Sequence, residues 1–316
     1  MGRALGINAI MAIAFESVYG TAPVSGFKKV PFVSTAFGKE QGLLASDLLG
    51  FGRDPLAPAG DVINAGGDVV VPVDLRYFGF WLKALFGAPV TTELDDDVYS
   101  HVFTTASAAL PSLSGEVGHP EIPAFSMHKG YVANSLALQL QRSGLVNATI
   151  GFIGQDEDEP TSSTATGTPS ELELTRFNQF QGSVKRAGAA LGNVVSAQLN
   201  YANTLESVEV IRADGLIAGA DPGLAVLGAS LVVRHDSLTL YNQAIAKTPV
   251  ELEFGLTISA TAKLAFTFAA AYLPVPKRPV SGPTGIQATY AVQAARPAVG
   301  DPMMTATLVN DVASYA

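Results

Sequence analysis

Four histidines are the side chains of this sequence best suited to acid–base catalysis or metal binding. They are His101, His119, His128 and His235. Zinc enzymes commonly hold their ion with histidines spaced H-x-x-x-H or H-E-x-x-H, which places both rings on one face of a helix. None of the four histidines has either spacing. We therefore expect histidines at strand ends on the surface, and no histidine-based metal site.

Acidic residues offer two further kinds of site, a calcium loop and a pair of catalytic carboxylates. The acidic runs Asp95–Asp97 and Asp156–Glu159 lack the D-x-[DN]-x-[DN]-G spacing of a calcium loop. Glu116 and Glu121 are spaced so that they could form a glycosidase pair, but nothing else in the sequence singles them out. We expect both acidic runs to be solvated turns.

Motifs for phosphate binding and nucleophilic catalysis are absent from the sequence. It contains no G-x-x-x-x-G-K-[ST] loop and no G-x-S-x-G elbow. The G-x-G-x-x-G motif that Gly50-Phe51-Gly52 could begin is incomplete, because Pro55 occupies the position of its last glycine. There is no cysteine, which excludes disulfides and thiolate metal ligands. The sequence therefore predicts no catalytic residue, no cofactor and no metal, and a protein that is not an enzyme.

The composition favours a folded protein with an unusually uncharged surface. Of the 316 residues 48% are hydrophobic and only 15% are charged, against about 25% in ordinary domains. The net charge is −9 and the basic residues cluster only in pairs, which argues against tight DNA binding. No apolar run reaches the length of a membrane helix, and Ala4–Phe15 is better interpreted as a first strand or arm than as a signal peptide.

Most of the chain alternates apolar and polar residues at period two, as strands do. The clearest strand segments are Tyr131–Leu140, Val194–Leu199, Leu205–Ile211, Val226–Val233, Val250–Ile258 and Ala262–Ala269. Two segments have helical spacing instead. We predict a helix over 75–86 with Asp74 as its N-cap, and a helix over 237–247 with Asp236 as its N-cap.

Two segments interrupt these elements. Thr35–Gly67 is rich in Gly, Pro and Asp, so we expect a long irregular loop whose apolar residues pack against something. Gly154–Ser170 is acidic and then rich in Ser, Thr and Gly, so we expect a solvated linker that divides the chain almost in half.

The two halves follow the same order of strand, Asp, helix, Pro and further strands, which indicates an internal duplication. The predicted organisation has four parts. They are an N-terminal arm over 1–27, a first β domain over 28–158 with the loop 35–67, a linker over 159–175, and a second β domain over 176–316.

Several segments, taken in order, resemble the tail tube (major tail) proteins of long-tailed, siphovirus-type bacteriophages. They are Glu16–Pro23, Pro31–Ser34, Glu40–Pro55, Gly67–Gly87, Gly282–Tyr290 and Leu308–Tyr315. The resemblance implies a mainly β fold of two tandem tail-tube-like β-sandwich or barrel units, each with one short α-helix, plus an extended arm.

The resemblance also implies a function. The chain would be a structural virion protein that assembles in the host cytoplasm into the stacked rings of a hollow phage tail tube, through which genomic DNA passes. Its partners would be copies of itself and the tail terminator, tape measure and distal tail proteins. DNA would cross the lumen without specific binding, and no membrane is implied. Two copies of the unit in one chain favour a homotrimeric, pseudo-hexameric ring over a true hexamer.

Physical properties of the sequence fit that role. A ring subunit hides much of its surface, and the strand edges that would be a hazard in a monomer can be completed by the next copy. The segment 35–67 is a candidate to reach an adjacent ring or subunit. A net charge of −9 per subunit would discourage DNA from sticking. Four acids on predicted strands face either the channel or outside solvent, namely Glu206, Glu209, Glu251 and Glu253.

Other classes remain open at this point. The acidic, cysteine-free, β-patterned sequence is compatible with an outer-membrane β-barrel. A glycan-binding or hydrolase β-sandwich on a virion or cell surface would need exposed aromatic residues around a cleft. The aromatic group Tyr77, Phe78, Phe80 and Trp81 instead fits the core side of a helix.

Overall fold

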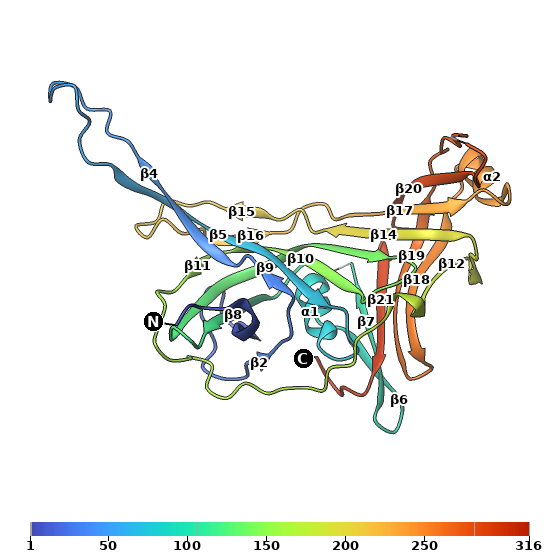
Figure 1. The fold of residues 1–316 in the computed structure, drawn as a ribbon, viewed down its shortest axis with the longest axis horizontal. Helices are drawn as coiled ribbons and strands as arrows, with labels where there is room; N and C mark the ends of the chain where they lie inside the picture. The colour runs from blue at the N-terminus through green and yellow to red at the C-terminus, as the bar shows by residue number, and fades with distance from the viewer. Residues whose placement is uncertain (1, 106, 281, 316) are drawn as a thin grey trace.

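The computed structural model describes residues 2–105, 107–280 and 282–315. Strands dominate these residues, and Figure 1 shows them arranged around the helix α1 (Phe78–Phe86) near the middle of the molecule. The second α-helix, α2 (Thr239–Ala246), lies at the far end. The mainly β fold expected from the sequence is confirmed.

A central antiparallel sheet runs through both halves of the chain. Its strands lie side by side in the order β4, β5, β10, β9, β14, β17 and β20. Their bounds are Gly38–Leu44, Ala59–Pro72, Asn147–Gly154, Ala124–Leu140, Val194–Ala202, Val226–Arg234 and Gln287–Ala295. The halves meet where β9 pairs with β14, with Leu138 opposite Leu199.

The first half folds a second layer from the same strand β9. The beginning of β9 pairs with β8 (Ser112–His119), which pairs with β1 (Ile10–Phe15), which pairs with β2 (Lys28–Lys29). Two short strands complete this region. They are β3 (Ser34–Thr35) on β5 and β11 (Asp156–Glu157) on β9.

The second layer at the other end combines strands of both halves. It runs β6, β7, β21, β19, β18, β12 and β13, with bounds Val90–Asp95, Val98–Thr104, Met304–Asn310, Ala262–Tyr272, Val250–Ser259, Gly182–Arg186 and Ala189–Ala190. The last residues of β19 also pair with β20, so this layer turns into the central sheet. A separate hairpin of β15 (Glu206–Val208) and β16 (Gly219–Asp221) extends the turn between β14 and β17.

The helix α1 is buried on nearly every side. All its residues except Lys83 are buried, as expected for a helix that is apolar all round. The ring of Tyr315 lies over it, with its centroid 5.0 Å from that of Phe80 in an edge-to-face contact. Gly79 makes this approach possible, because a Cβ there would lie 2.1 Å from the ring of Tyr315. The C-terminal residues thereby close the core.

Both helices were predicted, but their starts differ from the prediction. The first begins at Phe78, three residues later than expected, because Asp74 caps the turn before it by accepting hydrogen bonds from the backbone N–H groups of Arg76 and Tyr77. The second begins at Thr239, and the carboxylate of Asp236 accepts from the Asn193 side chain rather than capping the helix. The expected N-cap role of Asp236 is therefore wrong.

The segment 35–67 is a long hairpin, so the expected irregular loop is wrong for its strands and holds for its tip, residues 45–58. β4 pairs with β5 from Gly38 opposite Gly66 to Leu44 opposite Ala59, and Figure 1 shows the hairpin projecting from the molecule. Its outer residues are exposed on both faces, so no buried face imposes an alternating pattern on the sequence. At its base Gly67 has a φ of 131°, and a Cβ there would lie 2.1 Å from the carbonyl oxygen of Ala36.

We expect Tyr315→Ala to lower the free energy of unfolding by about 3–5 kcal/mol, the usual cost of deleting a buried aromatic side chain. The physical reason is the cavity left over α1 together with the unpaired groups around it. Urea unfolding of the unassembled subunit would measure the change. Tyr272→Ala is the matched control, because that ring is 41% exposed, and an equal loss in both variants would contradict the assigned role of Tyr315.

Candidate functional site

The four histidines lie apart, and the structure gives the two buried ones structural partners. The imidazole of His101 bonds the Thr91 hydroxyl at 2.8 Å and the Val312 carbonyl at 2.8 Å. His128 packs against the rings of Phe37 and Tyr131. Burial lowers the pKa of both His101 and His128, which favours their neutral forms. The expectation that all four lie on the surface is therefore wrong for these two.

The candidate glycosidase carboxylates also serve as structural acceptors. Glu116 is buried and accepts from the Ala165 backbone N–H at 2.6 Å and from threonine hydroxyls of the same segment. Glu121 accepts from the Leu5 backbone N–H at 3.0 Å and from the Asn8 side chain. The two carboxylates thus hold two different segments onto the first half.

The acidic run 156–159 links neighbouring strands through hydrogen bonds and ion pairs, so it is not a free solvated turn. Asp156 accepts from Lys39 at 3.2 Å, and the Glu157 carboxylate accepts from the backbone N–H of Lys39 at 3.1 Å. Asp158 pairs with Lys129 at 2.5 Å. These bonds fix the base of the β4–β5 hairpin to β9. Within the described ranges, no group of three or more His, Cys, Asp or Glu side chains could hold a metal ion.

The segment 159–175, expected as a solvated linker, follows the surface of the first half as a strap. Thr161 exchanges backbone hydrogen bonds with Phe125, and Ser170 does so with the chain at Phe27–Lys29. Farther along, the Leu172 backbone N–H donates to the Tyr77 hydroxyl at 2.6 Å. Figure 1 shows this yellow-green segment crossing beneath the sheets from one half to the other.

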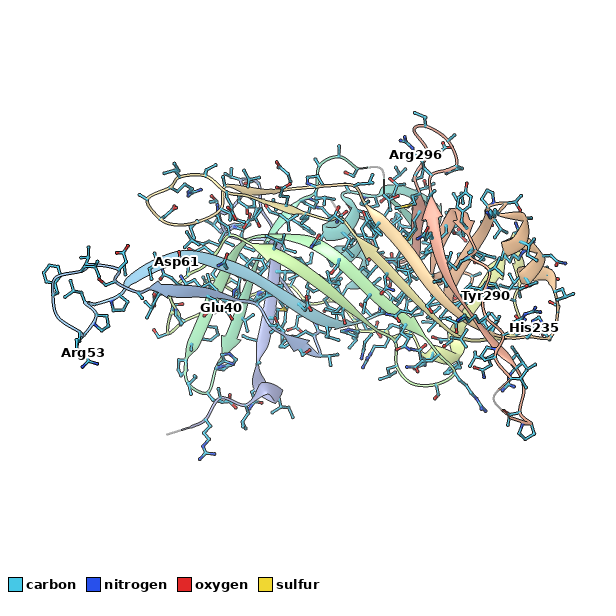
Figure 2. All side chains as sticks on the ribbon, turned by 90° about the horizontal axis from the view of Figure 1, so that it is seen from above. Glu40, Arg53, Asp61, His235, Tyr290 and Arg296 are labelled. Atoms are coloured by element: carbon cyan, nitrogen blue, oxygen red, sulfur yellow. The ribbon has the colours of Figure 1, made fainter. Side chains whose placement is uncertain are left out.

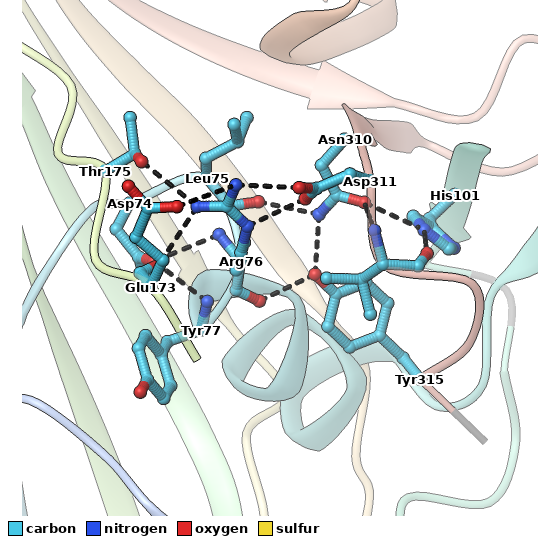
Figure 3. A network of polar contacts seen from close by, with 11 residues as sticks. Asp74, Leu75, Arg76, Tyr77, His101, Glu173, Thr175, Asn310, Asp311 and Tyr315 are labelled. Carbon is cyan, nitrogen blue, oxygen red and sulfur yellow. Dashed lines mark hydrogen bonds and ion pairs between the residues drawn. The ribbon is translucent and has the colours of Figure 1, made fainter. Parts of the chain in front are cut away.

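A polar network around Arg76 joins three parts of the chain (Figure 3). The guanidinium of Arg76 donates to both carboxylate oxygens of Asp311, at 2.8 and 2.7 Å, and to the Glu173 carbonyl at 3.0 Å. The Tyr315 hydroxyl donates to the Arg76 carbonyl and accepts from Asn310. The ion pair lowers the pKa of Asp311. The network therefore locks the C-terminal residues and the strap onto the start of α1.

Asp74 stands beside this network and carries a perturbed carboxyl group. It is fully buried, and one of its oxygens has no hydrogen-bond partner. Burial raises its pKa to about 6 in spite of the backbone hydrogen bonds it accepts. Burial of the carboxyl within the packed core thus accounts for the perturbation.

One cavity of about 690 Å³ is lined by Glu206, Ser207, Val208, Glu209 and Asp221, and another of about 430 Å³ lies near the ends of β9, β12 and β14. The walls of the smaller cavity include Leu140, Phe180 and Val195, together with the guanidinium groups of Arg142 and Arg234. No His, Asp or Glu is among the residues that line it. The smaller cavity thus lacks the acid–base pair that hydrolysis requires.

The surface features best suited to function are strand edges that no other part of the chain completes. On the side away from β17, β20 pairs with β19 only through residues 293–295, so its stretch 287–292 has no strand partner among the described residues. At the opposite end of the central sheet, β4 pairs with β5 on one side, and past Lys39 no described strand lies on its other side. Open edges at both ends of one sheet allow copies to join edge to edge.

The β4–β5 hairpin carries exposed apolar side chains beyond the body of the molecule. Leu43, Leu49 and Phe51 are 73%, 93% and 65% exposed. Figure 2 shows Arg53 at its tip and Glu40 and Asp61 on its strands, at the opposite end of the molecule from His235. Apolar side chains in a projecting segment are typical of an interaction site.

These features agree with the comparison to known families, in which the phage tail tube protein family matches residues 6–294. The chain belongs to the phage tail tube protein family. No curated protein sequence gave a match to it. The resemblance noted in the sequence is thus confirmed, and this tail tube protein is a structural component of the bacteriophage virion. None of the helices within the described ranges is long and apolar enough to span a membrane.

The sequence indicated the tail tube family, but its pattern did not predict the β4–β5 hairpin of this chain. The signal that could have revealed it is weak, namely the two glycines Gly66-Gly67 next to the alternating run that ends β5. The structure also places the four acids left open by the sequence. Glu251 and Glu253 lie on β18 in the second layer, with Glu253 paired to Lys185 at 2.7 Å, whereas Glu206 and Glu209 lie on or next to β15.

We expect the stability of this tail tube protein to fall as pH rises from about 4 to about 6 because of Asp74. Its carboxyl has a pKa of about 6 in the folded chain, against an ordinary value of 3.8. The folded state therefore favours the protonated form, and ionisation above both values costs about 3 kcal/mol at 1.36 kcal/mol per pH unit. Urea midpoints of the wild type and of Asp74→Asn across this range measure the effect. The variant should lack this loss of stability between pH 4 and 6, and identical pH profiles of the two proteins would contradict the role assigned to Asp74.

Proposed function

We propose that this protein is the subunit of a hollow tail tube, which self-assembles into stacked rings and lets genomic DNA pass into the host. It acts by assembly and not by catalysis, and it uses no cofactor or metal. Its partners are copies of itself, the tail terminator, the tape measure and the distal tail protein, and it assembles in the host cytoplasm. Family membership supports the general role, and the surfaces described above support the mode of assembly.

The observation that carries the assembly is the pair of open edges on one continuous sheet. The edge formed by β4 and the edge formed by residues 287–292 of β20 lie at opposite ends of the central sheet. A contact between unlike surfaces of identical copies closes into a ring when the rotation between copies allows it. Joined through these edges, the central sheets of neighbouring copies would form one wall around a channel.

Three chains per ring are the stoichiometry we propose. The order of strand, helix and hairpin occurs twice, as β5, α1, β6–β7 and as β17, α2, β18–β19. These repeats support two units over 28–158 and 176–316. The pairing is not identical, since β5 pairs with β10 whereas β17 pairs with β20. Two related units per chain would give a three-chain ring six similar positions.

Native mass spectrometry of rings tests this stoichiometry. We expect the mass of three 32.8 kDa chains, and tubes seen by electron microscopy should show six similar positions around the bore. Rings with the mass of six chains would contradict the trimer. Purified protein that forms neither rings nor tubes would contradict the proposed function as a whole.

The projecting hairpin is proposed to bind an adjacent subunit through its apolar tip. Leu44 and Ala59 lie opposite each other, so residues 45–58 can be replaced by a two-residue Asn-Gly turn that leaves the β4–β5 pairing intact. We expect this variant to fold and to stop at monomers or rings, because the tip contact is lost. Electron microscopy and light scattering measure the outcome.

Arg53→Gln is the matched control for that deletion, since it keeps the apolar tip. Urea unfolding of both variants before assembly separates a folding defect from an assembly defect. Long intact tubes from the shortened variant would show that the hairpin is not required.

A further inference from the structure

The exposed face of the central sheet is lined by uncharged amide side chains. In β14, Ala197, Leu199 and Tyr201 point into the core, so the residues between them point outward. The outward amides come from three strands of the sheet. They are Gln139 of β9, Gln198 and Asn200 of β14, and Gln287 and Gln293 of β20.

The strand registers place these amides in rows across the sheet, together with small and hydroxyl side chains. Gln139 is opposite Gln198, which is opposite Ser230. In the next row Asn200 lies between Ala137 and Gly228. The side chain of Gln198 also donates to Asn200 at 3.1 Å along the strand. The hydroxyl groups on the same face are those of Ser135, Thr149, Ser196, Ser230 and Thr289.

Charge is sparse on this face away from the projecting hairpin, whose strands carry Lys39, Glu40 and Asp61. Along β5, β10, β9, β14, β17 and β20, the outward positions within the paired registers include only Asp68 and Arg234 as charged residues. The outward side of the second layer carries more charged side chains of both signs, namely Glu251, Glu253, Lys185 and Lys263.

We infer that this neutral amide and hydroxyl face is the DNA-facing wall of the tube, and that duplex DNA slides along it because the wall neither attracts nor repels phosphates. The inference rests on the proposed tube function, and it names the surface and the chemistry that meet the DNA. The face belongs to the central sheet, whose outer strands β4 and β20 have open edges, so joining copies through those edges would make it continuous.

An uncharged wall explains passage without adhesion. Affinity for DNA comes largely from counterions released when Lys or Arg neutralise phosphates, and a face on which Arg234 is the basic residue within the paired registers releases few. Neutral hydrogen bonds from amides to phosphate are weaker than charge-assisted ones, and they compete with water. Amides and hydroxyls instead hold first-layer water, across which the DNA can move.

Cysteine labelling of assembled tubes tests which face lines the bore. The sequence has no cysteine, so Gln198→Cys supplies the one thiol per chain. In the unassembled subunit this thiol should react both with a small maleimide and with one that carries a long polyethylene glycol chain. In tubes it should react with the small reagent, which can enter the bore, and be protected from the long one.

Two results would overturn the inference while leaving the tube intact. Reaction of Gln198→Cys tubes with the long reagent would place this face on the outside. Protection from both reagents would place it inside a subunit contact. Absence of tubes from the wild-type protein would instead refute the proposed function.

A charge insertion tests the chemistry of the wall. Gln198→Lys would place a ring of positive charge in the bore at every level of the tube. We expect DNA release from virions carrying it to slow on the order of tenfold at low salt and to approach the wild-type rate at high salt, because counterions screen the new contacts. Release is scored as the ratio to wild type at each salt concentration.

Thr257→Lys is the matched control for that insertion, since it adds the same charge to an exposed strand position of the second layer. It should leave the release ratio unchanged at every salt concentration. An equal slowing by both variants, or no slowing by Gln198→Lys in assembled tubes, would overturn the account of the wall.

Discussion

Two strands that each belong to two sheets hold the molecule together. The beginning of β9 pairs with β8 while its end pairs with β14, and β19 pairs with β21 and then with β20. Buried backbone groups must keep their hydrogen bonds. The two halves therefore could not separate without exposing the edge of a shared strand. The pairing of β7 with β21 adds a third link, and one hydrophobic core extends through both halves.

The polar groups around Arg76 are hydrogen-bonded within the chain, whereas the backbone groups at two strand edges are not. Around Arg76, charged and backbone groups from the helix start, the strap and the C-terminal residues bond to one another. At β4 and at residues 287–292 of β20, the strand edges remain open. The core is thus held by bonds within the chain, while the two ends of the central sheet keep backbone groups available for other chains. A subunit built in this way can join copies without rearranging its core.

The sequence predicted the helices and strands that bury one face against the core. It did not predict strands that are exposed on both faces. The strands over 131–140 and 226–233 and the helix near 75–86 carry apolar residues at a fixed period, because packing on the core requires it. The hairpin over 38–72 has no such period in its outer part, since both of its faces are exposed. The assignment of Glu116 and Glu121 to structural contacts depends on partners far away in sequence, which no local pattern reveals.

The separation of neutral and charged faces follows from the same period of two. A strand in a two-layer fold gives one side to the core and one to its surroundings, so the outward side is free to match whatever it meets. On β14 that side presents Gln198 and Asn200, whereas on β18 it presents Glu251 and Glu253. A strongly acidic subunit is thus compatible with an uncharged channel wall, because net charge belongs to the whole chain and sliding depends on one face of it.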